Sequence, residues 1–319
     1  MEEEFAGLSL NSRIGYLYDE SLLLHKEDAT SWNEIPERIL TIHNDFNKED
    51  LISRCVTIPF DPATPEQVAR VHVSSLVDKL VNMRECEYPN IFDAEPRQAG
   101  TKYSFGQETD LWDNEYTSDC IFKSCGGVIK AVESVWRGEV HQAFANVRPP
   151  GHHSNSEFPA GFCFVNNVAV AAKFATEELG ARRVLIFDWD VHHGNGTQDI
   201  FESNDNIMFI SIHRFDHGSF YPFLPEKGIG TFTAPGDHKP FSYNIAWNCE
   251  GIKEQSNIGD GDYKLAFDNI VEPVIQQFNP DVIIVSAGFD AMEGDPLGKL
   301  SNTGAIYAYM THKLLEYAK

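Results

Sequence analysis

The residues best suited to chemistry are acidic and imidazole side chains that follow a short apolar run, Val184 to Phe187. Asp188, Asp190 and His192 alternate directly after that run. Burying such groups at the end of an apolar strand costs free energy unless something pairs with them. Carboxylates and imidazoles are ligands of divalent metals, so this stretch predicts a metal site.

A complete ligand set for that metal needs residues from more than one segment. Residues two apart on an extended chain point to the same side, so Asp190 and His192 can hold one cation. A third ligand from another expected strand end, Asp290, completes a set of two carboxylates and one imidazole. Three protein ligands with one open position are typical of a catalytic zinc site, where the metal polarises a carbonyl and lowers the pKa of a bound water.

A hydrolytic site also needs a general base, and the adjacent His152 and His153 offer two imidazoles. No serine or cysteine stands in a nucleophile motif, which favours direct attack by water over a covalent intermediate. Each piece has an ordinary alternative: a histidine pair is often simply packed, and an aspartate after a strand often caps a helix. The residues 194–196 (Gly-Asn-Gly) are typical of a turn.

The elements that must position these side chains alternate along the chain. Continuous apolar runs predict buried strands over 14–18, 143–147, 184–187, 207–212 and 282–285. Apolar periodicity predicts helices that open near Pro36, span 66–81, run from Gly126–Gly127 to Gly138, and cover 166–179 and 262–278 (with a kink or new turn at Pro273). His72 is expected to pack on the second of these helices, and residues 87–119 to form a surface loop.

This order of elements predicts the fold class. Repeated strand–helix units with continuous apolar strands indicate an α/β fold, a mostly parallel sheet covered by helices on both faces. Every polar cluster follows the C-terminal end of an expected strand, which is the edge where open α/β sheets bind ligands. Four segments are therefore expected to converge on one site.

Composition narrows the class of protein. The 319 residues are 42% hydrophobic, enough for a large core, and 25 basic against 48 acidic residues give a formal charge of −23. That charge argues against direct nucleic-acid binding and suits either a basic partner or a solvated acidic surface. The six cysteines form no CxxC pair, which is typical of a reducing compartment. No apolar run is long enough to cross a bilayer, and the acidic first residues are unlike a signal peptide, so we expect an intracellular protein of the nucleus or cytoplasm.

Several motifs together resemble the zinc-dependent histone deacetylase family. They are RPPGHH at 148–153, GFCFVNN at 161–167, DWDVHHGNG at 188–196, the pair His213-Arg214 and SAGFDA at 286–291. HHGNG, the His-Arg pair and AGFD are similar to its class II branch, and the resemblance runs from about Ile14 to Lys319. It implies the arginase/deacetylase fold, with three layers around a mostly parallel sheet.

The resemblance implies roles for the polar clusters. Asp190, His192 and Asp290 match the zinc ligands of the family. His153 matches its general base and then acid, with His152 beside it as an electrostatic partner.

Two further roles follow from the same motifs. Asp188 would orient His152, and Asn195 stands where class I enzymes have an aspartate behind the second histidine. A structural potassium ion would be held by Asp188, Ser211 and backbone oxygens that include that of Ile212; the ordinary alternative for Ser211 is a local hydrogen bond at a strand end.

The resemblance also implies a substrate tunnel for an acyl-lysine. Its positions are the aromatic walls Phe162 and Tyr221, with Gly161 before the first, the gate Leu297, the supporting Arg38 and the rim Asp110. Tyr221 departs from the phenylalanine that is common at the second wall. An apolar gate suits the neutral stem of an acylated lysine, whereas polyamine-preferring relatives place an acidic residue there.

We therefore expect a single deacetylase-like catalytic domain over 1–319 that hydrolyses the acetyl amide of acetyl-lysine in histones or other proteins, with corepressors among its possible partners. The family's catalytic tyrosine lies on a loop after one further strand, and the sequence stops at Lys319 before that loop; Ile229–Phe241 also lacks the usual glycine-rich spacing. A catalytically weak or inactive acyl-lysine or partner-binding module is thus an alternative. An acetylpolyamine amidohydrolase is a further one, and a two-metal arginase-like enzyme is less favoured.

Overall fold

A computed structural model describes residues 13–26, 33–83, 103–105, 108–224, 242–249 and 255–318. The chain forms two compact units, Met1–Leu179 and Gly180–Lys319, and each is described by itself. The expectation for Ile229–Phe241, and much of that for 87–119, lie outside the described residues. Within the ranges given above, no helix is long and apolar enough to cross a membrane.

The first unit contains a parallel three-stranded sheet, a two-stranded hairpin and five α-helices among its described residues. In chain order these are β1 (Ile14–Leu17), α1 (Glu37–Lys48), β2 (Val56–Thr57), α2 (Pro65–Val68), α3 (Ser74–Asn82), β3 (Tyr103–Phe105), β4 (Glu108–Leu111), α4 (Thr117–Trp136), β5 (Gln142–Ala145) and α5 (Asn167–Glu177). The sheet order is β2-β1-β5, and β3 pairs with β4 antiparallel.

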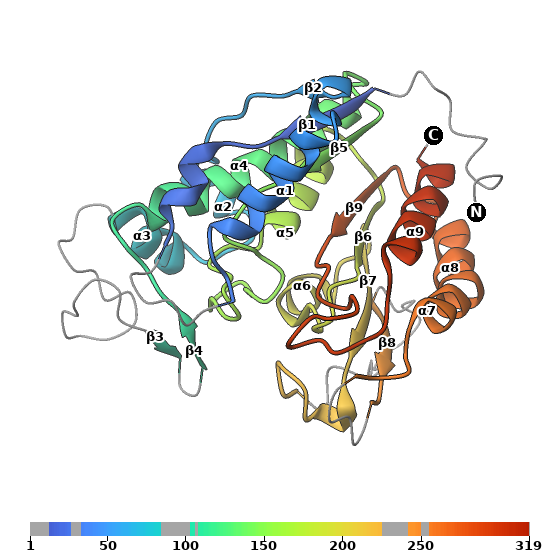
Figure 1. The fold of residues 1–319 in the computed structure, drawn as a ribbon. Helices are drawn as coiled ribbons and strands as arrows, with labels where there is room; N and C mark the ends of the chain where they lie inside the picture. The colour runs from blue at the N-terminus through green and yellow to red at the C-terminus, as the bar shows by residue number, and fades with distance from the viewer. Residues whose placement is uncertain are drawn as a thin grey trace. The chain divides into compact units, whose positions relative to one another are not determined.

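Helices cover both faces of the sheet in the first unit (Figure 1). Tyr16 of β1 and its partner Phe144 on β5 point to α1, where both pack against Phe46. The opposite face presents Leu17, which lies in one apolar cluster with Cys120 and other α4 residues. Side chains alternate between the faces of a strand, so each face meets its own helix layer.

Two predicted boundaries in this unit are wrong, and so is the placement of His72 on a helix. The periodic stretch 66–81 is two helices, because the chain turns at 69–73 and restarts at α3. His72 lies in that turn, buried, and its Nε2 accepts a hydrogen bond from the backbone of Asn166 at 3.0 Å. Part of the expected loop 87–119 is strand β4 and the start of α4.

The glycine pair 126–127 lies inside α4 and does not precede it. A Cβ on Gly126 would lie 2.7 Å from the backbone nitrogen of Ala63, and one on Gly127 would crowd the ring of Phe60 at 3.0 Å. These glycines let the segment 60–63 pack directly on the helix. These glycines lie within the helix because two segments approach closely there. Interpreting them as a helix boundary overlooks that role.

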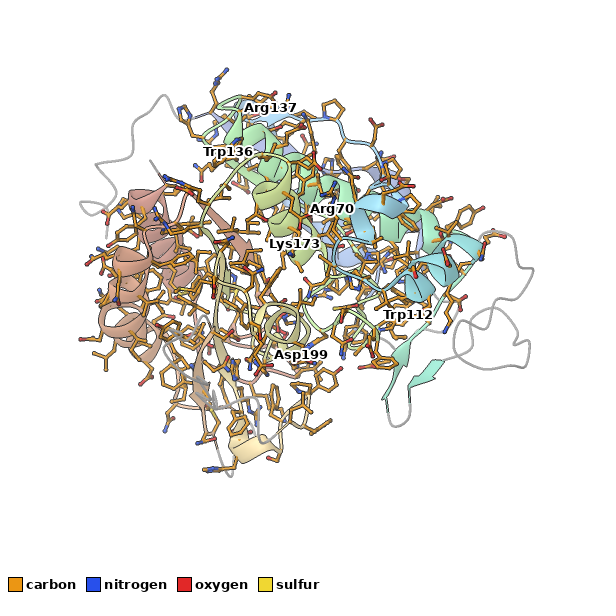
Figure 2. All side chains as sticks on the ribbon, turned by 180° about the vertical axis from the view of Figure 1, so that it is seen from behind. Arg70, Trp112, Trp136, Arg137, Lys173 and Asp199 are labelled. Atoms are coloured by element: carbon orange, nitrogen blue, oxygen red, sulfur yellow. The ribbon has the colours of Figure 1, made fainter. Side chains whose placement is uncertain are left out.

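The last helix of this unit, α5, begins at Asn167, within the predicted range 166–179. The side chain of Asn166 caps it by accepting the backbone N–H of Ala169 at 3.0 Å. On its exposed side, Glu177 pairs with Arg70 at 2.8 Å and with Lys173 at 3.4 Å. Figure 2 shows the two basic residues side by side. The Arg70 pair connects the turn after α2 with α5, and the Lys173 pair lies within α5.

The second unit contains a parallel four-stranded sheet in the order β8-β7-β6-β9. Its described elements are β6 (Val184–Asp188), α6 (Asn195–Phe201), β7 (Ile207–Arg214), β8 (Ser242–Trp247), α7 (Asp260–Ala266), a π-helical turn (Phe267–Val271), α8 (Glu272–Phe278), β9 (Val282–Ser286) and α9 (Gly304–Tyr317). All three strand pairs are parallel, with Asp188 beside Ser211 on β7 and Ser286 on β9.

Helices lie on both faces of this sheet too. α7, α8 and α9 cover the face that presents Leu185 and Phe187, and α6 lies on the other face (Figure 1). The strand β6 is fully buried, which is why its sequence is continuously apolar. The expected α/β class, with parallel strands and helices on both faces, is confirmed in each unit.

Two predictions in this unit need correction. Strand β7 runs on through His213 and Arg214, because both residues pair with β8, a strand that the sequence analysis did not predict. The amphipathic stretch 262–278 is interrupted by the π-turn, after which α8 begins with Pro273 in its first turn, as expected. Val271 and Ile275 are buried on either side of the junction between the π-turn and α8, whereas Ile270 is exposed.

Candidate metal centre

The centre lies at the C-terminal end of β6, between the neighbouring strands β7 and β9. Asp188 ends the strand and is fully buried. Its Oδ1 accepts the backbone N–H of Asp190 at 3.1 Å, so the chain turns sharply and presents the next residues at the sheet edge. This edge is where a parallel sheet is expected to bind ligands.

Three side chains meet there. The ligand atoms of Asp190, His192 and Asp290 all lie within 4.8 Å of one another. Nδ1 of His192 is 3.0 Å from Oδ1 of Asp190 and 3.0 Å from Oδ2 of Asp290. Across the described ranges, no second group of three histidine, cysteine, aspartate or glutamate residues comes together in this way.

Backbone donors hold the two carboxylates in place. The N–H of Val191 donates to Oδ1 of Asp290 at 2.8 Å, and the N–H of His192 donates to Oδ1 of Asp190 at 2.8 Å. Such outer contacts fix ligand orientation and are as much a part of a metal site as the ligands.

Glycines make room for the ligands. A Cβ on Gly288 would overlap the carboxylate of Asp190, and one on Gly298 would overlap the backbone carbonyl of Asp290. A Cβ on Gly194 would likewise collide with the carboxylate of Asp188. Gly194 and Gly288 stand in recognisable motifs, but this packing role is not predictable from them, because close approach between distant segments leaves no local pattern.

The electrostatics of the three side chains favour a cation between them. Burial raises the pKa of Asp290, and the nearby Asp190 carboxylate raises it further. Burial lowers the pKa of His192, but its hydrogen bonds to Asp190 and Asp290 outweigh that and raise the pKa to about 10. Two carboxylates so close repel each other unless positive charge lies between them. The donor set of two oxygens and one nitrogen therefore fits a divalent metal such as zinc.

Two aromatic rings flank His192. Phe220 stacks on its imidazole, with centroids 5.0 Å apart and planes 8° apart. Tyr221 meets it edge-on at 5.9 Å and 79°. Tyr221, expected as a tunnel wall, is thus beside the cluster, whereas Phe220 was missed although it is the first residue of the same Phe-Tyr-Pro triplet.

The other expected residues of this unit lie around the same sheet edge. Ser211 is buried, and its Oγ is 2.8 Å from Nδ1 of His213, the local hydrogen bond that was the ordinary alternative to potassium binding. Ile212 is buried beside it on β7. Asn195 is the first residue of α6. Leu297 is 42% exposed, in a turn held by the Asp295 carboxylate.

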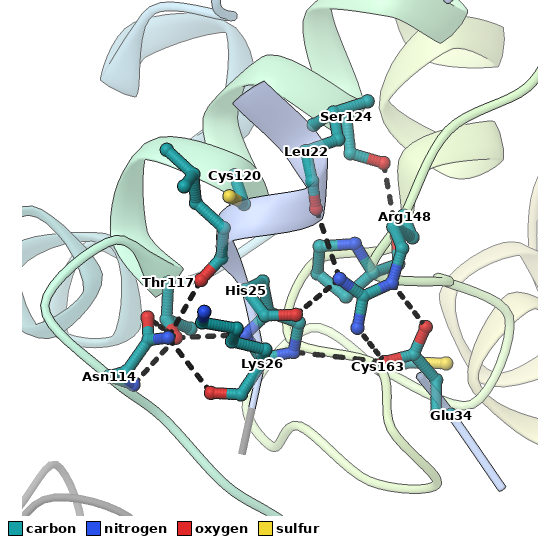
Figure 3. Close-up of polar contacts among 12 residues, drawn as sticks. Leu22, His25, Lys26, Glu34, Asn114, Thr117, Cys120, Ser124, Arg148 and Cys163 are labelled. Atoms are coloured by element: carbon teal, nitrogen blue, oxygen red, sulfur yellow. Dashed lines mark hydrogen bonds and ion pairs between the residues drawn. The ribbon is translucent and has the colours of Figure 1, made fainter. Parts of the chain in front are cut away.

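The histidine pair belongs to the first unit. His152 and His153 are both buried, and their ring centroids are 3.9 Å apart. They follow Arg148, which is buried as well and forms an ion pair with Glu34. Nε of Arg148 donates to Oε1 of Glu34 at 2.8 Å, and its Nη1 donates to the carbonyl oxygens of Leu22 and His25 (Figure 3).

This buried ion pair anchors the segment that leads into the histidines. A buried arginine retains its charge only when its donors are satisfied, and here carboxylate and carbonyl oxygens satisfy them. His25 packs beside the pair. Its Nδ1 is hydrogen-bonded to Oγ1 of Thr117 at 2.8 Å. Burial lowers the pKa of His25 to about 4, so it is neutral at pH 7. No motif in the sequence indicates this network.

The expected substrate residues of the first unit are spread over several segments. Gly161 and Phe162 both have left-handed backbones, with φ of +54° and +66°, and the ring of Phe162 meets that of Trp112 edge-on at 5.8 Å. Asp110 is on β4 and partly buried. Arg38 is in the first turn of α1 and exposed. The structure thus brings together the three carboxylate and imidazole ligands in one unit and the histidine pair in the other.

Comparison with known proteins gives one consistent result. The family model described as "Histone deacetylase domain" matches residues 33–319. Histone deacetylase 5 of Arabidopsis thaliana is 36% identical over 313 residues, which cover 96% of this chain and 45% of that protein. A polyamine deacetylase of Danio rerio is 33% identical over 305 residues, covering 95% of this chain and 43% of that protein. The chain therefore spans about half the length of these relatives.

A solved structure has the same fold. The crystal structure of the HDA15 HD domain superimposes with a TM-score of 0.83 at 35% identity, covering 96% of this chain and 81% of that one.

Proposed function

Because this chain belongs to the histone deacetylase family, we propose that it hydrolyses the acetyl amide of acetyl-lysine side chains in proteins. The observation that carries the proposal is the cluster of Asp190, His192 and Asp290 at the end of β6. It is the kind of three-ligand set that leaves a position open for chemistry.

The metal in this proposal is zinc. Asp190, His192 and Asp290 would hold it, and bound there it would polarise the acetyl carbonyl and lower the pKa of a water. Asp188, through its hydrogen bond to the backbone of Asp190, keeps the ligand loop (residues 189–192) in place. A potassium ion held by Asp188, Ser211 and the backbone of Ile212 is a further proposal, supported by the family resemblance and by the burial of Asp188 and Ser211.

The proton transfers are proposed for the histidine pair. His153 takes a proton from the attacking water and later delivers one to the departing ε-amino group of lysine. His152, with its ring 3.9 Å away, supports the charge that forms on His153. Asp188 and Asn195 would orient these imidazoles. The buried Arg148–Glu34 pair supports this proposal, because it fixes the segment just before the histidines.

The substrate side of the proposal involves Phe162 and Tyr221 as the walls that enclose the acyl-lysine stem. Gly161, just before the first wall, has a left-handed backbone and no side chain of its own, which supports this part of the proposal. Leu297, apolar and exposed, is the gate. Asp110 at the rim and Arg38 complete the set that the family resemblance implies.

Histones and other acetylated proteins are the proposed substrates, with the nucleus or cytoplasm as the proposed location. A basic, lysine-rich peptide suits the formal charge of −23, and corepressor proteins are further proposed partners. Neither a membrane nor direct nucleic-acid binding is part of the proposal.

The test is a turnover assay on the zinc-loaded full-length protein with an acetyl-lysine peptide and, in parallel, acetylspermidine. We expect hydrolysis of the peptide, loss of activity on chelation and its return on addition of zinc. Faster hydrolysis of acetylspermidine would instead make this a polyamine deacetylase. One bound zinc with no hydrolysis of either compound would make it an acyl-lysine or partner-binding module.

A further inference from the structure

Arg214 is part of the His-Arg pair that marks the class II resemblance, and the proposed function gives it no role. It is the last residue of β7, and its side chain is only 12% exposed. Its backbone N–H donates to the carbonyl of Val191 at 2.8 Å. Val191 stands between the ligands Asp190 and His192, so the strand end is tied to the ligand loop.

The nitrogen atoms of the guanidinium group contact two further segments. Its Nε and Nη2 lie 2.7 Å and 2.6 Å from Oδ2 of Asp216. Its Nη1 donates to the carbonyl of Gly298 at 3.1 Å and lies 3.5 Å from that of Leu297. Arginine suits this role because its planar fork of donors reaches several acceptors at once.

Asp216 is itself held in a conformation that costs free energy. Its φ is +49° and that of His217 is +54°, a left-handed pair without glycine. The other carboxylate oxygen of Asp216 accepts the backbone N–H of Cys249 at 2.6 Å. The residue is buried and strained, and both of its carboxylate oxygens accept hydrogen bonds. This indicates that the surrounding structure holds the carboxylate in one fixed position.

The guanidinium group also contacts an aromatic ring that flanks the metal centre. The Arg214 guanidinium carbon is 4.4 Å from the centre of the Phe220 ring, and the same ring stacks on the imidazole of His192 with centroids 5.0 Å apart. Guanidinium, phenyl ring and imidazole thus form one stack. Through it, Arg214 limits the rotation of His192, while its edge holds the turn that carries Leu297.

We propose that Arg214 is a positioning residue that joins His192, through Phe220, and the Leu297 turn into one rigid body. It thereby determines how firmly the metal is held and how large an acyl group is accepted. The effect on the size of the acyl group rests on the proposed function, whereas the effect on metal binding rests on the cluster geometry alone.

The test compares R214K with wild type. Lysine keeps the charge but loses the fork and the flat face. The matched control is R182K, because the Arg182 side chain is exposed in the same unit. Zinc release is followed by transfer to a chromogenic chelator, and kcat/KM is measured with acetyl- and butyryl-lysine peptides. Phe220→Leu removes the ring between Arg214 and His192 but keeps the guanidinium contacts to Asp216 and Gly298, so it separates the two effects.

We expect R214K to bind zinc roughly 10–100-fold more weakly, as for other groups that orient metal ligands. Its preference for acetyl over butyryl should shrink about tenfold, the scale of one or two methylenes in a pocket. F220L should weaken zinc binding and leave the acyl preference intact. Zinc release from R214K at the rate of R182K would overturn the proposal. If wild type hydrolysed neither peptide, the proposed function would fail, and zinc release would still decide the role of Arg214.

Discussion

A single methyl group added at Gly288 tests whether the metal centre depends on close packing behind Asp190. Gly288 lies between the end of β9 and the ligand Asp290. A Cβ at this position would lie 2.7 Å from Cβ of Asp190 and even closer to its carboxylate. Carbon atoms pack at roughly 3.5–4.0 Å, so Asp190 must move by about 1 Å in Gly288→Ala.

A displacement of that size should weaken zinc binding without unfolding the sheet. Outer contacts that misplace a ligand typically cost about 10–100-fold in metal affinity, which is roughly 1.4–2.7 kcal/mol. The assay is competition for zinc against a chelator of known affinity, with far-ultraviolet circular dichroism to confirm folding.

The matched control is Gly261→Ala, in the first turn of α7, where an added Cβ meets nothing within 4 Å. Alanine there should leave zinc binding unchanged and stabilise the helix by about 0.5–1 kcal/mol. If G288A held zinc as tightly as G261A, the packing behind Asp190 would not matter and the reasoning would be refuted.

Further predictions concern the buried network, the gate and acid stability. Glu34→Gln should lower the free energy of unfolding by roughly 3–5 kcal/mol, because it leaves Arg148 charged and buried; a denaturant curve that matches wild type would contradict this. Leu297→Glu should shift the preference from acetyl-lysine peptide toward acetylspermidine, measured as a ratio of kcat/KM, and an unchanged ratio would remove Leu297 from the gate. The pKa of both His25 and His72 is lowered by burial to about 4 in the folded chain. The unfolded chain binds these protons near pH 6.5, so stability should fall as the pH drops from 6.5 toward 4, by about 2 kcal/mol per histidine between pH 6.5 and 5. His72→Gln should flatten that slope in denaturant titrations, and an equally steep slope would count against the assignment.

The sequence was most informative where one local rule decides the outcome. The apolar run at 184–187 is short and ends at a polar cluster, which favours a buried strand, and the structure confirms it as β6. The alternation of Asp190 and His192 placed both side chains on one side of the chain, and Asp290 joins them because it follows the neighbouring strand.

Prediction failed where distant segments decide the conformation. The helix boundary expected at Gly126–Gly127 was wrong because those glycines make room for the segment 60–63, a contact that no local pattern announces. The ion pair between Arg148 and Glu34 joins residues 114 apart in the chain. The helix predicted over 262–278 assumes 3.6 residues per turn throughout, and the π-turn at Phe267–Val271 breaks that periodicity.

The roles of the site residues follow a similar division. The three ligands are adjacent in the second unit, as the strand-end pattern predicts. Residues with roles taken from family motifs alone, such as Asp110 and the exposed Arg38, stay predictions.

The most direct test of the central claim is turnover of an acetyl-lysine peptide by zinc-loaded His153→Ala in the full-length protein, beside wild type. We predict one zinc per chain in both proteins and a fall in kcat of about 10²–10⁴-fold in the variant, the usual contribution of a positioned general base. Undiminished turnover in the variant would contradict the account.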